Sequence, residues 1–304
     1  MTKEIRGLVV PTITVFTPED LIDEDGLRRH TRFLIESGVD GIFAVGSTGE
    51  SQKLSIEERK RVVEIVLDET AREVPVLAGT GVETTRGTIA LSKHAEAAGA
   101  DGVVIVPPTY TRITLREVVE HYKTVSQNIG IPIMVYNNPA RSMIDLTPDA
   151  LAKLSEIKNI RLVKESSGDL RRIDQIINKT AGKLTVMMGT DSIAFEGMLA
   201  GAKGWVASSA NVIPKECAAI TGAALAGDYA KAKDLFYRAL PFFNAIETQV
   251  DVTVKEALLL LGHRVGHPRK PSLPMEADQV NELRKRLLSL GTVGSVIPIG
   301  RQHT

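Results

Sequence analysis

Several short polar clusters in this sequence directly follow apolar runs, and they carry groups suited to carbonyl chemistry. Lys164 ends the apolar run at residues 160–164 and is followed at once by Glu165. Lysine is among the residue types least often buried, because leaving water disfavours its ammonium form. A desolvated amine is partly free NH2 and can attack a carbonyl carbon to form a Schiff base. The alternative is a structural lysine that pairs with Glu165 or another carboxylate.

A glycine-rich segment, Gly-Ser-Thr-Gly-Glu at residues 46–50, offers a second kind of chemistry. A tight turn of this composition presents backbone N–H groups, and Ser47 and Thr48 add two hydroxyls, which together suit a carboxylate or phosphate oxygen. The segment lacks the Gly-Lys-Ser/Thr of a P-loop and the dinucleotide fingerprint, so a plain structural turn is the alternative. We expect Glu50 to serve structure, by accepting from local N–H donors or by pairing with a buried arginine.

Tyr136 and Arg141 lie in a third cluster, Tyr-Asn-Asn-Pro-Ala-Arg at residues 136–141. A phenol near an amine can pass protons while a Schiff base forms and breaks, so Tyr136 is a candidate relay. The alternative is a packed tyrosine whose hydroxyl is hydrogen bonded. Arg141 could hold a substrate carboxylate through two parallel hydrogen bonds, or it could be a solvated loop arginine.

Other reactive residue types point to packing and not to chemistry. His263 and His267 have a spacing that invites a metal, but the glycines and the proline around them break the helix that would align them. No His-Glu-x-x-His motif, cysteine pair or carboxylate triplet with the spacing of metal ligands is present, so we expect no metal site. Cys217 fits a buried core thiol, and Trp205 fits barrel or interface packing.

Parallel strands would bring these clusters together. Eight apolar runs bounded by turn residues predict strands at residues 8–16, 41–45, 76–78, 103–106, 133–136, 161–164, 184–188 and 205–207. Helical segments lie between them, and the sequences that begin at Ser55 and Thr114 are capping boxes, while Thr147 precedes a proline at a first helical position. This alternation predicts an α/β fold, a (β/α)8 or TIM barrel spanning residues 1–210. In such a barrel the active site lies at the carboxyl ends of the strands, where the clusters fall.

The pattern changes after residue 209. Segments at residues 214–227, 229–244, 254–261 and 275–290 have helical character without intervening strands. We expect residues 211–304 to form the last barrel helix and a helical C-terminal extension that packs on the barrel. No linker rich in Gly, Ser or Pro separates this part, which argues against an independent domain.

Composition narrows the classes of partner. The 304 residues include 37 basic and 37 acidic residues, so no positive field favours nucleic acid or an anionic membrane. A small-molecule substrate is the expected partner. The single cysteine, Cys217, excludes an intrachain disulfide, and no run has the length and apolar character of a signal core or membrane span. We therefore expect a cytoplasmic protein.

The combination of clusters resembles the class I Schiff-base lyases that include dihydrodipicolinate synthase and N-acetylneuraminate lyase. Residues 46–50 are similar to the glycine-rich motif of that family, residues 136–141 to its tyrosine motif, and residues 162–169 to its lysine motif. The resemblance implies that Lys164 forms an imine with pyruvate or another 2-oxo acid. It also implies that Tyr136 relays protons with Ser47 and with Tyr110 supplied across a subunit interface, in a homotetramer that needs no cofactor or metal.

Substrate-binding roles also follow from the resemblance. Ser47 and Thr48 would bind the pyruvate carboxylate, and Val206 would line the pocket near it. An arginine at the position of Arg141 is typical of the synthases, which implies an acidic second substrate, so pyruvate plus aspartate semialdehyde is the first expectation. Residues 250–253 replace a typical Asn-Pro-x-Pro run, and Thr109 replaces one of two paired tyrosines.

Alternatives within and outside this chemistry stay open. A 2-keto-3-deoxy sugar-acid or hydroxy-oxo-acid aldolase, or a related dehydratase, would use the same imine. A barrel that binds a 2-oxo acid without converting it is the alternative from another class. Gly87 and Thr109 replace groups that bind feedback lysine in some synthases, so the sequence predicts insensitivity to lysine.

Overall fold

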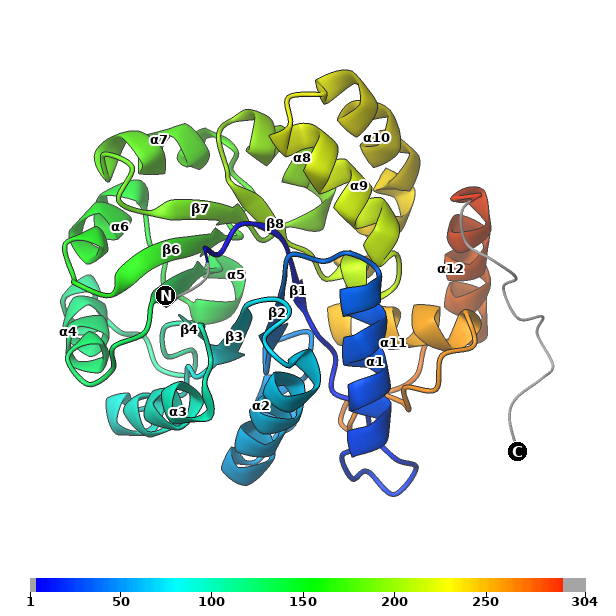
Figure 1. Cartoon of the computed structure of the whole chain (residues 1–304), viewed down its shortest axis with the longest axis horizontal. Helices are drawn as coiled ribbons and strands as arrows, with labels where there is room; N and C mark the ends of the chain where they lie inside the picture. The colour runs from blue at the N-terminus through cyan, green and yellow to red at the C-terminus, as the bar shows by residue number, and fades with distance from the viewer. Residues whose placement is uncertain (1–3, 292–304) are drawn as a thin grey trace.

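Eight parallel strands form a closed barrel in which consecutive strands pair and β8 returns to β1 (Figure 1). The computed structural model describes residues 4–291. The strands are β1 (Gly7–Pro11), β2 (Gly41–Ala44), β3 (Val76–Gly79), β4 (Gly102–Ile105), β5 (Ile133–Asn137), β6 (Ile160–Glu165), β7 (Thr185–Met188) and β8 (Gly204–Val206). The predicted (β/α)8 fold is confirmed.

Helices surround this barrel and extend beyond it on one side (Figure 1). The first eight are α1 (Glu24–Glu36), α2 (Ile56–Thr70), α3 (Thr85–Ala98), α4 (Leu115–Ser126), α5 (Pro139–Ser142), α6 (Pro148–Ser155), α7 (Arg171–Lys179) and α8 (Ala194–Leu199). Four more follow β8: α9 (Pro214–Leu225), α10 (Tyr229–Ile246), α11 (Val250–Leu260) and α12 (Ala277–Ser289). The predicted capping boxes at Ser55 and Thr114 are both formed, and the Thr147 side chain accepts from the backbone N–H of Ala150.

Two predicted boundaries were wrong, for identifiable reasons. The first strand ends at Pro11 and not at residue 16, because the backbone beyond it bonds elsewhere: the N–H of Ile13 donates to Asn211 Oδ1 at 3.2 Å. Helix α11 begins at Val250, four residues before the predicted start. Its first turns contain β-branched residues of low helix propensity, but several of these are buried, so tertiary packing overrides the local preference.

The barrel interior is a layer of inward-facing apolar side chains. Successive residues of a strand point to opposite faces, so residues two apart share a face. Met134 on β5 is paired with Leu162 on β6, and both belong to the interior cluster. Two residues further along, Tyr136 is paired with Lys164. The phenol and the amine therefore lie directly above the apolar layer, at the carboxyl end of the barrel.

Helix length and composition bear on membrane insertion. Among residues 4–291, none of the helices combines the length and the apolar character that a bilayer crossing requires.

Candidate active site

Lys164 lies inside the barrel beside two aromatic rings. Its Nζ is 4.4 Å from the centroid of the Tyr136 ring and 5.8 Å from that of Phe43. The residue is only 4% exposed. Within the described residues 4–291, no carboxylate lies within ion-pair distance of its amine. The amine is thus held by ring faces, which attract a cation weakly and leave the nitrogen free to react.

Glu165, the neighbour considered as an ion-pair partner for Lys164, points away from it. Strand alternation places the two side chains on opposite faces of β6. The Glu165 carboxylate accepts from Asn137 Nδ2 at 2.9 Å and from the backbone N–H of Ser167 at 2.7 Å. Asn137 Oδ1 in turn accepts from the N–H of Leu146. Glu165 therefore fixes the loops after β5 and β6, and the structure does not form the ion pair with Lys164.

Tyr136 is positioned to exchange protons with this amine. Asn138 Nδ2 donates to its phenolic oxygen at 3.0 Å. Burial favours the neutral phenol, but the charge of Lys164, the Asn138 hydrogen bond and the charge of Arg141 outweigh it and lower the pKa of Tyr136. A lowered pKa makes the phenol a better proton donor and increases the fraction of phenolate, the form that can accept a proton.

A cavity of about 450 Å³ opens above Lys164 and Tyr136. Gly189 forms part of its wall, and a Cβ there would lie 2.8 Å from Lys164 Cε and would collide with Ser166 Oγ. Only glycine leaves this approach to the amine open. The other lining residues are mostly polar: Ser47, Thr48, Tyr136, Asn138, Ala140, Arg141, Lys164, Ser166, Ser167, Gly168, Thr190, Asp191, Ser208, Ile246, Glu247 and Val250.

The glycine-rich turn forms the opposite wall of this cavity. Ser47 and Thr48 both line it, and Thr48 Oγ1 is 2.9 Å from Ser208 Oγ. The turn is closed by backbone bonds from Glu50 to Ser47 and from Ser51 to the Gly46 carbonyl. Hydroxyls and N–H groups at a tight turn suit a carboxylate, so this wall can hold the acid group of a 2-oxo acid.

The remaining predicted site residues lie at different depths. Arg141, on the short helix α5, is exposed and lines the mouth of the cavity. Val206 is fully buried in the interior cluster with Tyr136 and is not a lining residue. Tyr110 is 87% exposed and lies outside the Lys164 cavity. The structure therefore brings together Lys164, Tyr136, the turn and Arg141, while Tyr110 is exposed and lines an adjoining cavity that Ser47 and Tyr136 also line.

Sequence reasoning missed three polar residues of this cavity, Ser166, Asp191 and Ser208. They stand one to three residues beyond the ends of β6, β7 and β8. Ser166 lies within the lysine motif but was given no role, and the other two lie outside the three motifs. Asp191 is buried and accepts from the indole N–H of Trp205 at 3.0 Å and from the N–H of Ser209 at 2.7 Å. Burial raises the pKa of Asp191, although these donors oppose the shift. Their positions just after parallel strands were the signal that could have identified them as site residues.

The structure also places the residues that were assigned to packing. Cys217 is buried, as predicted, and burial raises the pKa of its thiol. Trp205 is buried against Phe243, with ring centroids 5.3 Å apart. Glu50 serves structure, as expected, and accepts from the backbone N–H of Arg269, but within residues 4–291 its ion-pair partners are Lys255, at 2.6 Å, and Lys53, and not an arginine side chain. In the part of the chain that the structure describes, no group of three or more His, Cys, Asp or Glu is arranged for a metal ion.

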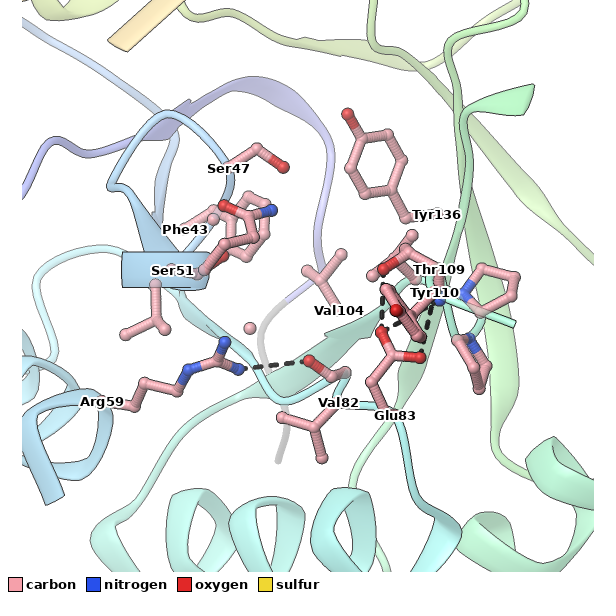
Figure 2. A pocket seen from close by; sticks show the side chains of 18 residues that line it. Phe43, Ser47, Ser51, Arg59, Val82, Glu83, Val104, Thr109, Tyr110 and Tyr136 are labelled. Atoms are coloured by element: carbon pink, nitrogen blue, oxygen red, sulfur yellow. Dashed lines mark hydrogen bonds between the residues drawn. The ribbon is translucent and has the colours of Figure 1, made fainter. Parts of the chain in front are cut away.

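A second cavity, of about 420 Å³, adjoins the first and shares Ser47 and Tyr136 with it (Figure 2). Arg59 and Glu83 face it from the side opposite Ser47 (Figure 2). The Arg59 guanidinium donates to the Gly81 carbonyl at 3.2 Å, and burial lowers the pKa of Arg59. The two cavities are therefore separated by residues that the catalytic chemistry would use.

Comparisons with known proteins agree on one family. The family model described as "Dihydrodipicolinate synthetase family" matches residues 4–290. A 4-hydroxy-tetrahydrodipicolinate synthase from Methanothrix thermoacetophila is 40% identical over 287 residues, which is 94% of this chain and 97% of that protein. The same-named protein from Methanocaldococcus jannaschii is 36% identical, covering 95% of this chain and 99% of its own.

Solved structures agree with these relatives. A dihydrodipicolinate synthase from Acinetobacter baumannii, described as chloride inhibited and complexed with pyruvate, superposes with a TM-score of 0.92 at 33% identity. The match covers 95% of this chain and 99% of that one. The synthase from Aquifex aeolicus gives a TM-score of 0.91 at 34% identity over 95% of this chain and 99% of that one.

Proposed function

The chain belongs to the dihydrodipicolinate synthetase family, and from this premise we propose that it is a lyase whose Lys164 forms a Schiff base with pyruvate. One observation carries the proposal: a buried lysine, with no carboxylate within ion-pair distance among residues 4–291, lies 4.4 Å from the Tyr136 ring in a polar cavity. The free amine of such a lysine is the nucleophile that forms a Schiff base.

Proton transfers between Lys164, Tyr136 and substrate complete the reaction. The amine attacks the keto carbon, the keto oxygen gains a proton, and the resulting hydroxyl leaves as water when the imine forms. Tyr136 passes these protons, aided by Ser47. The cationic imine withdraws electrons from the adjacent methyl carbon, which loses a proton to the relay, and the resulting enamine attacks an aldehyde carbon. The aldehyde oxygen takes up a proton as the new carbon–carbon bond forms and the cationic imine is restored. Water then hydrolyses the imine, releases the product and restores Lys164.

The walls of the cavity suit two acidic substrates. The turn with Ser47 and Thr48 would bind the pyruvate carboxylate, with Val206 in the layer beneath it. Arg141 at the mouth would hold a carboxylate of the incoming aldehyde. Together with the names of the relatives, this supports condensation of pyruvate with aspartate semialdehyde, the reaction of a 4-hydroxy-tetrahydrodipicolinate synthase, without a metal or organic cofactor.

The proposal also includes an oligomeric state and a cellular compartment. Tyr110 is 87% exposed, which leaves it available to a neighbouring subunit, and we assign it to the relay of a partner's Tyr136 in a homotetramer. Full activity would then require assembly. The single, buried cysteine is compatible with a reducing compartment, and we place the protein in the cytoplasm.

A second candidate function uses the same imine with a hydroxylated partner, as in a 2-keto-3-deoxy sugar-acid or hydroxy-oxo-acid aldolase. The favouring observation is the density of hydroxyls in the cavity, which come from Ser47, Thr48, Ser166, Ser167, Thr190 and Ser208. Ser166 Oγ is buried, and within residues 4–291 no group meets it in hydrogen-bond geometry. A substrate hydroxyl would satisfy it.

Reductive trapping tests the proposal directly. Borohydride added with pyruvate should fix a pyruvyl-sized adduct on Lys164, identified by peptide mass spectrometry, and Lys255 serves as the internal control that stays unmodified. No adduct with pyruvate or other 2-oxo acids would contradict the mechanism and favour a barrel that binds without converting.

A screen of aldehydes then separates the two candidate functions. Turnover of aspartate semialdehyde that falls in Arg141→Ala and persists in Ser166→Ala supports the synthase. Turnover of polyhydroxy aldehydes with the reverse pattern supports the aldolase.

A further inference from the structure

The turn at residues 46–50 is held in a conformation that its own residues disfavour. Val45 and Glu50, which flank its glycines and hydroxyls, have φ angles of 60° and 59°. The left-handed region costs non-glycine residues of order 1–3 kcal/mol each and is maintained only where the surroundings determine it. A β-branched residue such as Val45 is especially disfavoured there. Contacts outside the turn must therefore hold Ser47 and Thr48 in place.

Thr14 and Ser208 contact this turn, and further contacts, several of them from the C-terminal part of the chain, meet at Glu50. The Glu50 side chain is completely buried and lies 2.6 Å from Lys255 Nζ on α11, whose side chain is also completely buried. Lys53 Nζ is 3.0 Å from the other carboxylate oxygen, which also accepts from the backbone N–H of Arg269 at 2.8 Å. Lys255 further donates to the His267 carbonyl and lies 4.1 Å above the Phe16 ring.

Asp251 extends this arrangement into a closed four-charge network. Lys53 Nζ lies 2.7 Å from Asp251 Oδ2, and Ser272 Oγ donates to the same oxygen at 3.2 Å. Burial opposes ionisation, but the hydrogen bond and charge of Lys53 lower the pKa of Asp251. Asp251 and Lys255 are four residues apart on α11, so both face the turn. The two positive charges of Lys53 and Lys255 are thus matched by the two negative charges of Glu50 and Asp251.

We propose that α11 positions the carboxylate-binding turn through Asp251 and Lys255, which makes the C-terminal extension a working part of the site. The inference rests on the proposed function. Two ion pairs link α11 to this region, one between Asp251 and Lys53 and one between Lys255 and Glu50. Asp251 and Lys255 touch no cavity atom that reacts, and both act through Glu50 and Lys53.

A contribution to the free energy of unfolding does not by itself explain the ion-pair network of Glu50, Lys53, Asp251 and Lys255. Buried ion pairs are often replaceable by apolar side chains without loss of stability, because desolvation offsets their attraction. Their directional bonds nevertheless fix where a backbone segment lies. We expect the turn to bind the substrate carboxylate equally well in the ground state and in the transition state. A change that displaces the turn should therefore raise KM and leave kcat unchanged.

The test is the isosteric variant Asp251→Asn, which removes one charge. We expect the KM for pyruvate to rise about fivefold to tenfold with kcat within about twofold, as for lost uniform binding. Asp251→Glu should recover most of the loss. The control is Glu69→Gln, which breaks the ion pair of Glu69 with Arg32 between α1 and α2, away from the turn. It should leave KM unchanged.

Hydrogen exchange provides a readout that does not depend on catalysis. Amides of residues 46–50 should exchange faster in Asp251→Asn than in the wild type and in Glu69→Gln. Unchanged KM and unchanged exchange would overturn the proposal, as would a rise in KM matched by the control. If the wild type forms no pyruvate adduct, the proposed function fails, and exchange at the turn still decides whether α11 positions it.

Discussion

Among residues 4–291 two lysines are buried, Lys164 in the barrel and Lys255 on α11, and a carboxylate distinguishes them. Lys164 is 4% exposed, faces Tyr136 and Phe43, and has no ion-pair partner within residues 4–291. Lys255 is fully buried, lies over Phe16, and is 2.6 Å from Glu50. Burial lowers the pKa of Lys255 to about 8, although Glu50 favours its charged form.

The difference assigns a role to each lysine. The ammonium of Lys255 is held in place by a buried carboxylate and a backbone carbonyl. While it is protonated, its nitrogen has no lone pair with which to attack a carbonyl carbon. An amine surrounded by ring faces and a cavity is open to an electrophile. Burial alone therefore does not identify a nucleophile. The absence of a nearby carboxylate among the described residues does more to distinguish Lys164 from Lys255.

The largest expected effect comes from changing each lysine to methionine. Lys164→Met should lower turnover by at least about a thousandfold, as expected for loss of the nucleophile, without loss of stability, because it removes an unpaired buried ammonium. Lys255→Met should lower the free energy of unfolding by about 3–5 kcal/mol, because it leaves Glu50 buried and unpaired. Urea denaturation and pyruvate turnover measure the two effects.

A double variant sharpens this contrast. Adding Glu50→Gln to Lys255→Met removes the uncompensated charge, so part of the lost stability should return. Equal destabilisation by Lys164→Met and Lys255→Met would show that both lysines are structural. Survival of turnover in Lys164→Met would contradict the assignment of the nucleophile.

Titration of Tyr136 gives an intermediate effect. The charge of Lys164 is the main influence that opposes burial in setting the pKa of Tyr136. Removing that charge in Lys164→Met should raise the pKa of Tyr136, so its phenolate should form at higher pH. Ultraviolet absorbance of the phenolate follows the titration, and Tyr136→Phe identifies its signal among the five tyrosines. Lys255→Met is the matched control and should leave this titration unchanged.

An unchanged Tyr136 titration in Lys164→Met would mean that the ammonium does not act on the phenol. That result would weaken the proposed relay between the two groups while leaving the role of Lys164 as nucleophile to the trapping experiment.

The sequence predicted the architecture well because apolar runs and capping boxes are local signals. It also predicted that Lys164 and Tyr136 stand near the ends of strands, and each lies one residue before the end of its strand. It could not show that Lys164 and Lys255 differ, because their environments depend on residues far away in the chain. For the same reason it did not name Lys53 or Lys255 as ion-pair partners of Glu50. Ser208 was missed because a single polar residue after a strand resembles any loop residue.

Tyr110 shows a different limit of sequence reasoning. Its proposed role depends on a second subunit, and neither the sequence pattern nor the geometry of one chain tests it. In this chain Tyr110 is 87% exposed, its backbone N–H donates to Glu83 at 3.1 Å, and it lines the cavity of Figure 2 together with Ser47 and Tyr136.

The smallest expected effect is that of the free amino acid lysine, tested as an inhibitor. The cavity of Figure 2 contains one carboxylate, Glu83, but Thr109 donates to Oε1 through both its N–H and its hydroxyl, and Tyr110 donates to Oε2. Burial opposes ionisation, yet these donors lower the pKa of Glu83. Arg59 places a positive charge in the same cavity and disfavours a second cation.

The comparison of the two buried lysines explains why free lysine should not inhibit. Lys255 is stabilised because Glu50 points at its ammonium, whereas Glu83 already accepts three hydrogen bonds. We expect a saturating concentration of lysine to change the rate of pyruvate condensation by less than about twofold, since no available carboxylate compensates desolvation of its ammonium. Strong inhibition would show that Glu83 exchanges its backbone donors for the ligand. The variant Thr109→Val, which removes the hydroxyl donor to Glu83, should then bind lysine more tightly than the wild type.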